Sequence, residues 1–287
     1  NFINDTGNII KSIQAGGGMR TEAQGEQLAA IMQNIIMAAK ATNKKAKRLW
    51  LNDIDPIILV DNLEQKYDLK QEPYNIDVII GEYDAPEKQE QGLVKYDFLN
   101  DGNTLIYGND GIERENLLET IVYSSTLFHT AEEVNYYIID YGSESFRKYA
   151  KLPHIGGIVL LGEEEKYNNL IKLIKSEIQK RKKVLSNYGG DYKNYIKHAE
   201  NKLPLKVIII NNYDSLYENN STIYVELPDL TRDSERYGVI FIITGNAANS
   251  VQSRISQNFH NTYAFKLKDV SDYSSIFGVR CKSTPRE

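Results

Sequence analysis

Short runs rich in apolar residues recur along this chain, and stretches with apolar residues at helical spacing lie between several of them. The apolar runs cover residues 78–81, 93–98, 104–106, 134–139, 158–161, 207–210, 239–243 and 263–267. The helical stretches include 116–122 and 163–187, and Lys and Arg residues fill the outer face of the second. Strands that alternate with helices predict an α/β fold with a mainly parallel sheet flanked by helices.

Polar residues or glycines directly follow four of the apolar runs. They are Gly108, Asp140, Asn211 with Asn212, and residues 244–246. The carboxyl ends of parallel strands meet at one edge of a sheet, and ligands bind at that edge. We therefore predict that these residues lie together and form the functional site.

The first part of the chain differs from the rest. Residues 1–20 are polar and contain three consecutive glycines, which predicts a flexible lead-in. Residues 21–75 are predicted to form a linker helix and strands that pack on the following module, which occupies residues 76–287. The helix begins near Thr21, and its apolar face consists of Leu28, Ile31, Met32, Ile35 and Ile36.

The turn from Gly108 to Glu115 lies between a predicted strand and a predicted helix, which is the context of a phosphate-binding loop. That loop has the pattern Gly-x-x-x-x-Gly-Lys-Ser/Thr. Here Gly108 takes the first glycine position, and Asn109, Asp110, Gly111 and Ile112 follow it. The second glycine position holds Glu113, the lysine position Arg114 and the hydroxyl position Glu115.

These substitutions change the chemistry of the loop. A phosphate loop aims backbone N–H groups and a helix N-terminus at anionic oxygens, whereas Glu113 and Glu115 place carboxylates there. One carboxylate about 5 Å from a phosphate charge costs roughly 3 kcal/mol at an effective dielectric near 20. Arg114 can return part of this cost through forked hydrogen bonds. An ordinary strand–turn–helix with an acidic helix start stays open as an alternative.

Composition narrows the class of protein. The 287 residues suffice for a large core, and 41% hydrophobic with 25% charged residues is typical of a globular domain. The net charge of -5 disfavours a dedicated nucleic-acid binder. One cysteine, Cys281, fits a reducing compartment. No membrane span or signal peptide is predicted, and a start at Asn1 suggests a piece of a longer protein.

Several motifs occur in an order that resembles a known family. Residues 81–91 fit the pattern Gly-x-x-Asp-x-Pro-x-x-Gln-x-Gln. Residues 137–142 fit a second strand, and residues 152–156 fit the Leu-Pro-His turn that follows it. Leu203–Pro204 leads into the apolar run 207–210. Together they resemble the FtsK/SpoIIIE class of RecA-like ATPases. The chain is most similar to one ATPase module of the type VII secretion coupling proteins EssC/EccC, which implies a RecA-like P-loop NTPase fold.

The resemblance also shows which site residues depart from an active module. Such a module has Gly-Lys-Ser/Thr in place of Glu113, Arg114 and Glu115, and Asp-Glu at the Walker B position of Asn211 and Asn212. A neutral amide supplies neither the charge that Mg²⁺ prefers nor a base for the attacking water. We therefore expect weak binding of ATP and Mg²⁺, little hydrolysis, and a place as the second of tandem modules.

The resemblance further implies a role and partners. The chain would be part of a membrane-anchored secretion motor on the cytoplasmic side of the bacterial cell membrane, where it regulates or couples export of small WXG100-type helical proteins. Expected partners are neighbouring ATPase modules of the same chain and these substrates, with a hexamer in the full-length protein. Contact with the membrane is expected only through parts outside this chain, and no nucleic acid is expected.

Two alternatives remain from the sequence. The first is an active ATP-hydrolysing module that uses Arg114 in place of lysine. The second is a relative of the DNA translocases, marked by a small basic DNA-reading domain at the C-terminus.

A few further polar residues are candidates for site roles. Arg254 is a candidate contact to a nucleotide bound by a neighbouring subunit, against the alternative of a surface arginine. His154 is predicted to be structural. His129, His198 and His260 lack ligand-like spacing, so no metal site is predicted.

Overall fold

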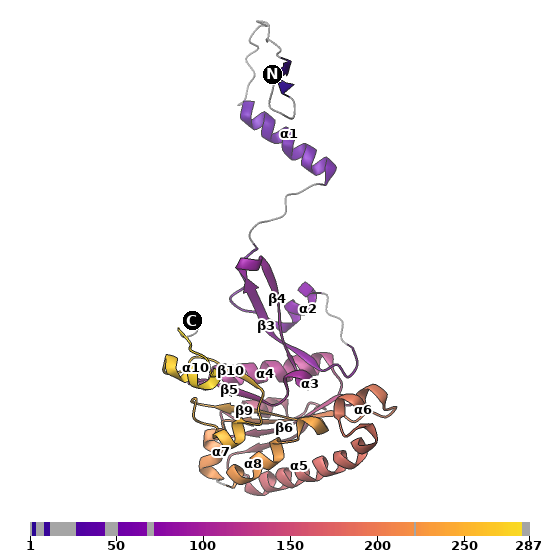
Figure 1. The fold of residues 1–287 in the computed structure, drawn as a ribbon, viewed down its shortest axis with the longest axis vertical. Helices are drawn as coiled ribbons and strands as arrows, with labels where there is room; N and C mark the ends of the chain where they lie inside the picture. Colours follow the sequence, from indigo (N-terminus) through magenta and orange to yellow (C-terminus); the bar gives the residue numbers. More distant parts are fainter. Residues whose placement is uncertain are drawn as a thin grey trace. The chain divides into compact units, whose positions relative to one another are not determined.

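The computed structural model describes residues 2–3, 9–11, 27–43, 51–67, 72–220 and 222–282 (Figure 1). The chain divides into two compact units, residues 1–51 and 52–287, which are described separately below. Residues 12–20 with the three glycines, and the predicted helix start at Thr21, lie outside the described residues. Among the helices that the structure describes, none is long and apolar enough to cross a membrane.

The first unit contains a short hairpin and one helix. Strands β1 (Phe2–Ile3) and β2 (Ile9–Lys11) pair antiparallel. Helix α1 (Gln27–Thr42) confirms the predicted helix. Its apolar face is exposed within this unit, with 57% of Ile35 and 48% of Ile31 accessible. The docking of this helix on a module stays a prediction.

The second unit is built on a six-stranded parallel sheet of order β10-β5-β9-β8-β6-β7 (Figure 1). Every neighbouring pair in this sheet runs parallel. The strands are β5 (Thr104–Tyr107), β6 (Val134–Asp140), β7 (Ile155–Leu160), β8 (Leu205–Asn211), β9 (Val239–Gly245) and β10 (Asn261–Ala264). The predicted α/β architecture is therefore confirmed, and β6, β8 and β9 coincide with the apolar runs 134–139, 207–210 and 239–243. Strand β10 begins two residues before the predicted run 263–267 and ends within it, and the runs 78–81 and 93–98 lie in a separate antiparallel hairpin.

Helices cover both faces of this sheet. They are α4 (Gly111–Phe128), α5 (Glu164–Leu185), α6 (Tyr192–His198), α7 (Tyr213–Asn219), α8 (Ile223–Thr231), α9 (Ser253–Ser256) and α10 (Val270–Phe277), with 3-10 turns η2 (Ser145–Tyr149), η3 (Ser186–Tyr188) and η4 (Glu235–Tyr237). Side chains alternate between the faces: Ile208 and Ile210 pack in the core under α5, α7 and α8, whereas Val207 and Ile209 pack in the core under α4 and α6.

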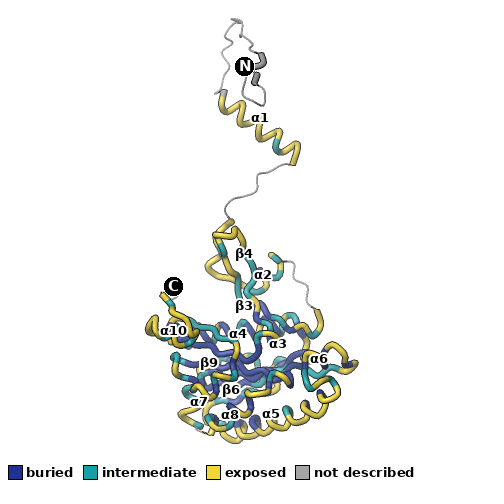
Figure 2. Tube along the Cα trace, in the orientation of Figure 1, coloured by how far each residue is buried: buried dark blue, intermediate teal, exposed yellow. Residues whose placement is uncertain are grey.

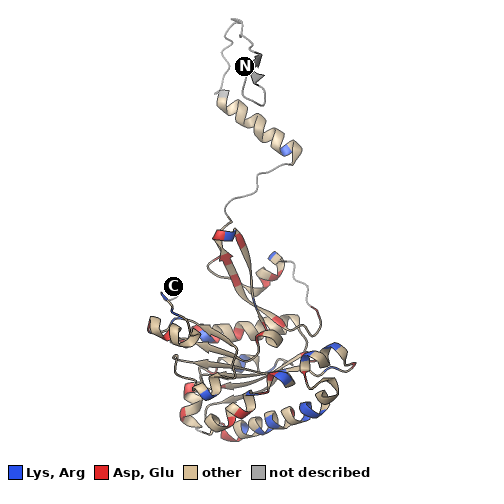
Figure 3. Cartoon of the chain, viewed as in Figure 1, with Lys and Arg blue, Asp and Glu red and all other residues tan. Residues whose placement is uncertain are grey.

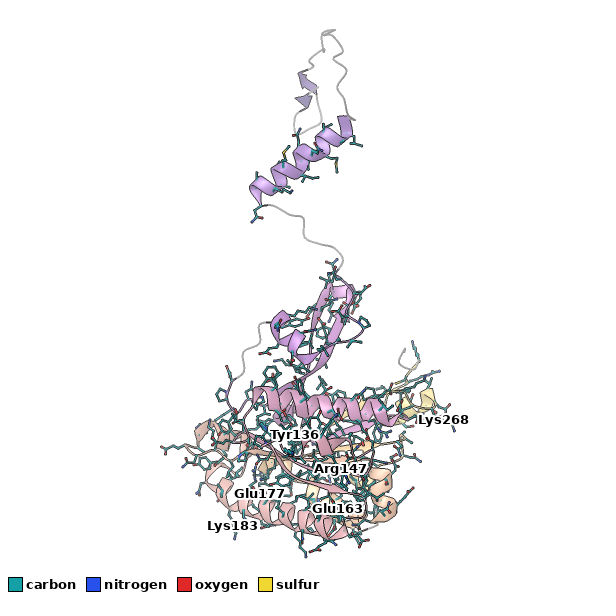
Figure 4. The ribbon with its side chains drawn as sticks, turned by 180° about the vertical axis from the view of Figure 1, so that it is seen from behind. Tyr136, Arg147, Glu163, Glu177, Lys183 and Lys268 are labelled. Carbon is teal, nitrogen blue, oxygen red and sulfur yellow. The ribbon has the colours of Figure 1, made fainter. Side chains whose placement is uncertain are left out.

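Most residues of the central strands are buried between the helices of the two faces. Figure 2 shows the central strands as the buried part of the unit. Tyr136 of β6 is fully buried in the core under α4, while Lys183 projects from α5 into solvent (Figure 4). The two cores are what hold the strand ends in place.

A long antiparallel hairpin extends from the sheet body (Figure 1). It consists of β3 (Asp77–Ala85), the 3-10 turn η1 (Pro86–Lys88) and β4 (Glu90–Asp97), and the short helix α3 (Phe98–Asp101) follows. Helix α2 (Val60–Tyr67) packs beside it, and Lys66 and Tyr67 both bond the Glu82 carboxylate. The motif at residues 81–91 therefore forms the outer half of this hairpin.

The register of the sheet brings the polar strand ends together. Asp140 of β6 lies opposite Asn211 of β8, and Tyr107 of β5 lies opposite Gly245 of β9. The prediction that these ends share one sheet edge is confirmed.

Candidate functional site

The turn after β5 supplies the residue that caps the following helix, α4. Asp110 is the N-cap of α4, and its side chain accepts a hydrogen bond of 2.8 Å from the Ile112 N–H. A carboxylate at a helix N-terminus is favourable because it faces unpaired N–H groups and the positive end of the helix dipole. It also takes the place that an anionic ligand would take at such a helix start.

Two further backbone N–H groups of this turn are engaged within the protein. The Gly108 N–H donates to the Gly245 carbonyl at 3.3 Å, and the Asn109 N–H donates to the Lys266 carbonyl at 2.9 Å. These bonds tie the turn to the ends of β9 and β10. The amides after Gly108 were the predicted phosphate contacts, and the first of them already has a protein acceptor.

Arg114, at the lysine position, is buried and folds back onto the sheet edge. Its guanidinium donates to the Gly108 carbonyl, to the Gly245 carbonyl at 3.4 Å and to Oδ1 of Asn246 at 2.6 Å. Burial lowers the pKa of Arg114, and the Asp214 carboxylate opposes this shift. The guanidinium nevertheless stays charged at neutral pH, so its hydrogen bonds are charge-assisted and strong.

Glu115, at the hydroxyl position, bonds to the Walker B position. The Asn211 side-chain amide donates to Glu115 at 3.0 Å and to Asp140 at 2.9 Å, while Thr244 donates to the Asn211 side-chain oxygen at 3.1 Å. Ser143 donates to Glu115 through its N–H at 3.1 Å and its hydroxyl at 2.6 Å. The two positions that the motif comparison predicts for the magnesium ligands of an active module are thus joined to each other.

Glycine is required next to this pair. A Cβ on Gly142 would lie 2.4 Å from Nδ2 of Asn211 and 2.6 Å from Oε1 of Glu115. Both distances are far below van der Waals contact, so a side chain at residue 142 would displace the pair. Gly142 ends the motif segment 137–142 described above. No motif includes Ser143, so the sequence gives no indication that this residue bonds Glu115.

Asn212, predicted to occupy the second Walker B position, acts as a structural cap. Its φ is 65°, in the left-handed region, and its side chain accepts from the Ser215 N–H at the start of α7. Its own N–H donates to Thr244 at 2.7 Å. Asp214, the nearest carboxylate along the chain, accepts from the Asn246 N–H at 2.8 Å. Asn212 therefore offers an amide where a carboxylate is predicted in an active module, and one oxygen of Asp214 is engaged by the turn after β9.

A pocket of about 360 Å³ remains between the start of α4, Gly142 with Ser143, and the end of β8. The Asp110 and Glu115 carboxylates line it. Glu113 follows on the same helix turn, and its Oε2 is buried without a hydrogen-bond partner among the described residues. The donors that also line this pocket, among them Arg114 and the Asn211 amide, are already bonded within the protein, so a nucleotide would meet carboxylates and occupied donors.

The other candidate residues lie apart from this pocket. Arg254 is exposed in α9, and its contact to a neighbouring nucleotide stays a prediction. His154 is buried, with Nε2 at 2.8 Å from the His129 carbonyl, which is a packing role. His198 and His260 are exposed. Within the described ranges no three potential ligands are grouped to hold a metal ion.

Glu133 lies close to His129, with 3.7 Å between Oε1 and the ring Nδ1. It accepts hydrogen bonds from the Thr130 and Tyr74 N–H groups, each at 2.8 Å. Burial acts to raise the pKa of Glu133, but these hydrogen bonds outweigh it and hold the pKa below its ordinary value.

Comparisons with known proteins agree with this fold. A sequence profile of the FtsK/SpoIIIE family matches residues 64–279. The ESX secretion system protein YukB of Bacillus subtilis is 30% identical over 196 residues, which is 68% of this chain and 13% of YukB. The type VII secretion system protein EssC of Staphylococcus aureus is 24% identical, covering 96% of this chain and 19% of EssC. The chain thus spans less than a fifth of these relatives.

Solved structures show the same likeness. The cytoplasmic domain of EssC superposes with a TM-score of 0.64 at 26% identity, covering 70% of this chain and 39% of that one. A fragment of EssC from Geobacillus thermodenitrificans that comprises ATPases 2 and 3 gives a TM-score of 0.65 at 26% identity, covering 72% and 40%. The sheet is therefore that of RecA-like P-loop ATPases, and the chain belongs to the FtsK/SpoIIIE family, with type VII secretion ATPases as its relatives.

Proposed function

We propose that this chain is an ATPase-like module of a type VII secretion motor and that it has lost efficient ATP hydrolysis. It is the second of a tandem set and regulates or couples export through its surfaces. The similarity to EssC supports the first part, because it extends over 96% of this chain. The loss of catalytic groups supports the second.

The observation that carries the proposal is the direct bond of 3.0 Å between Asn211 and Glu115. In an active module the hydroxyl beside the lysine and the Walker B acid hold a hydrated magnesium ion between them. Here the side chains at these two positions, Glu115 and Asn211, hydrogen-bond each other. Arg114 donates hydrogen bonds to three oxygen acceptors in the turn and at the end of β9. ATP binding would have to break these bonds and bring phosphates next to carboxylates.

Partners and location follow from the relatives. We propose neighbouring ATPase modules of the same longer protein as direct partners, because one solved relative comprises two adjacent ATPases. We further propose small helical WXG100-type proteins as the exported substrates and a hexamer as the assembled form. The proposed place is the cytoplasmic side of the cell membrane, with anchoring by parts outside this chain; one relative is described as a cytoplasmic domain.

Calorimetric titration of the 287-residue chain with magnesium-ATP tests the proposal. We expect a dissociation constant weaker than about 100 µM, two decades above that of a strong phosphate-loop site, from the Coulomb cost given earlier. A low-micromolar constant would contradict it. A parallel phosphate-release assay should give background turnover, and rapid turnover would instead favour an active site that uses Arg114.

A further inference from the structure

A second pocket lies at the base of the hairpin, far along the fold from the phosphate-loop turn. It measures about 460 Å³, which is larger than the pocket at Asn211. Its walls come from α6, from α3, from the segment before β3 and from the loop before β8. We call it the α6 pocket. Its lining includes Tyr74, Leu99, Asn100, Lys193, Lys197 and Lys202.

The α6 pocket carries uncompensated positive charge. Lys193 and Lys197 lie one turn apart on α6, and Lys202 follows in the next loop. Among the described residues none of the three has a carboxylate within ion-pair distance: Lys193 donates to the Asn100 side chain at 3.1 Å, and Lys202 lies 4.7 Å from the centre of the Tyr74 ring. Three ammonium groups thus face one pocket without a counter-charge of their own.

Two carboxylates, Asp97 and Glu72, also line the α6 pocket, so its three lysines and two acids leave a net charge of +1. Asp97 caps α3, because it accepts from the N–H groups of Leu99 and Asn100 and from the Asn100 amide. Glu72 is exposed at the rim. The surplus is therefore positive, and the ligand that fits it is an anion.

One wall of the α6 pocket is held in an unfavourable backbone conformation. Tyr74 has a φ of 63°, in the left-handed region that residues with a Cβ rarely adopt. The Glu133 carboxylate fixes it there through the 2.8 Å bond from the Tyr74 N–H. Strained residues that the surroundings hold in place concentrate at functional sites. The Tyr74 ring is thereby set against Lys202 as a fixed wall.

The donors of the α6 pocket are separate lysine ammonium groups, and its lining residues include no arginine that could grip one phosphate with two hydrogen bonds. As point charges, lysines attract carboxylates and phosphates alike. Their separation along α6 suits several anionic groups spaced along one ligand. Pro73, Leu99 and Ile196 add apolar surface between them. An acidic peptide segment with some apolar surface is therefore the best match.

This chain presents such a segment at the other end of the same hairpin. The tip, residues 84–90, carries the carboxylates of Asp84, Glu87 and Glu90 against one ammonium at Lys88, and all four residues are exposed (Figure 3). Asp84 and Glu87 have no ion-pair partner among the described residues. Pro86 lies between them and presents apolar surface.

The tip cannot reach the α6 pocket of its own molecule. The base of the hairpin, at Asp97, lines that pocket, whereas the tip lies at the far end of the nine residues of β3. At about 3.3 Å per residue the two are roughly 25 Å apart. Any contact between tip and pocket therefore joins two molecules.

We propose that the acidic hairpin tip of one copy of this chain binds in the α6 pocket of a second copy. The contact is head-to-tail: each copy offers a tip at one end of the hairpin and a pocket at the other. Repeated, such a contact closes into a ring or extends as a filament. It uses no residue of the phosphate-loop turn, so it stands independently of whether ATP binds.

Sedimentation velocity of the 287-residue chain over a concentration series tests the proposal. At low salt we expect concentration-dependent association that weakens as salt is added, because the contact depends on exposed charges. Lys193→Glu with Lys197→Glu reverses the pocket, and Asp84→Lys with Glu87→Lys reverses the tip. Each variant alone should associate at least about tenfold more weakly than the unmodified chain.

A mixture of the two variants gives the sharpest result. The pocket variant retains an acidic tip and the tip variant retains a basic pocket, so the mixture should associate more strongly than either variant alone. The matched control is Lys172→Glu with Lys180→Glu on the exposed face of α5, which changes the net charge equally and should associate like the unmodified chain. Circular dichroism of each variant confirms that it is folded.

Three results would overturn the proposal: an unmodified chain that stays monomeric throughout, a pocket variant that associates as strongly as the α5 control, or a mixture that stays monomeric. If the unmodified chain is monomeric while inorganic pyrophosphate binds at Lys193 and Lys197, the pocket belongs to a phosphate ligand and not to a second copy.

Discussion

Restoring the phosphate-loop residues should improve ATP binding without restoring hydrolysis. The variant is Glu113→Gly with Arg114→Lys and Glu115→Thr. It removes the Glu115 carboxylate, which lines the pocket, together with the neighbouring Glu113 carboxylate, and it supplies a hydroxyl for a magnesium ion. Because Asn211 and Asn212 remain, no carboxylate base is gained at the Walker B end.

The size of the effect can be worked out from charge and exposure. One carboxylate about 5 Å from a phosphate costs roughly 3 kcal/mol at an effective dielectric near 20. Glu113 and Glu115 are both partly exposed, so solvent and salt screen them. If about a quarter of the cost survives for each, the gain is roughly 1.5 kcal/mol, or about tenfold in Kd.

The same variant should be less stable. Arg114 donates three hydrogen bonds to carbonyl and amide oxygens, and a lysine can keep about one of them. Hydrogen bonds of a charged group contribute about 1.5–3 kcal/mol each. The loss of two such bonds should lower the free energy of unfolding in urea by roughly 3–6 kcal/mol.

Calorimetry with magnesium-ATP at one fixed salt concentration measures the binding. Glu164→Gln with Glu165→Gln, in the first turn of α5, removes the same number of carboxylates elsewhere and serves as the control. An unchanged Kd in a folded triple variant would show that the carboxylates do not limit binding. Rapid hydrolysis by the triple variant would show that the role given to Asn211 and Asn212 is wrong.

Three further predictions concern the rest of the chain. Gly142→Ala should separate Asn211 from its acidic partner and lower the free energy of unfolding by about 1–3 kcal/mol; an unchanged urea midpoint would contradict this. The lowered pKa of Glu133 stabilises the fold above the unfolded-state pKa of about 4.3. This contribution is lost as pH falls through the folded-state pKa, so Glu133→Gln should flatten the decline of stability measured between pH 6 and 3. Ile31→Asp with Ile35→Asp in the full-length protein should lower secretion at unchanged protein level. Each isoleucine contributes roughly 1.5–3 kcal/mol when the docked helix buries it, and the aspartates remove this contribution. Normal secretion together with fast hydrogen exchange across α1 would count against docking of this helix.

The sequence predicts the sheet well because the signal is local. Continuous Val and Ile runs such as 207–210 and 239–243 are typical of strands buried on both faces, and each became a central strand. The shared edge followed from parallel topology alone. Motif comparison also predicts the positions at which the loop departs from an active one, and this stays a prediction.

The hydrogen-bond network of the site could not be predicted in the same way. Position-by-position comparison reports that Glu115 and Asn211 are unusual, but not that they bond each other across 96 residues of sequence. The back-folded course of Arg114 depends on the end of β9, and the cap by Asp110 depends on where α4 begins. Such features arise from tertiary distances that no motif spacing encodes.

The carboxylate cap at Asp110 has a thermodynamic consequence for a motor. A protein that binds ATP gains stability as RT ln(1 + [L]/Kd), about 2.7 kcal/mol at a hundredfold excess over Kd. Its stiffness and its docking energy therefore vary with the nucleotide that it holds. In this module the Asp110 carboxylate already occupies the helix start, so ATP adds little stability. The docking energy of its surfaces therefore stays the same while neighbouring modules bind and release nucleotide. In a ring of modules that change state, it would be the fixed reference against which the others move.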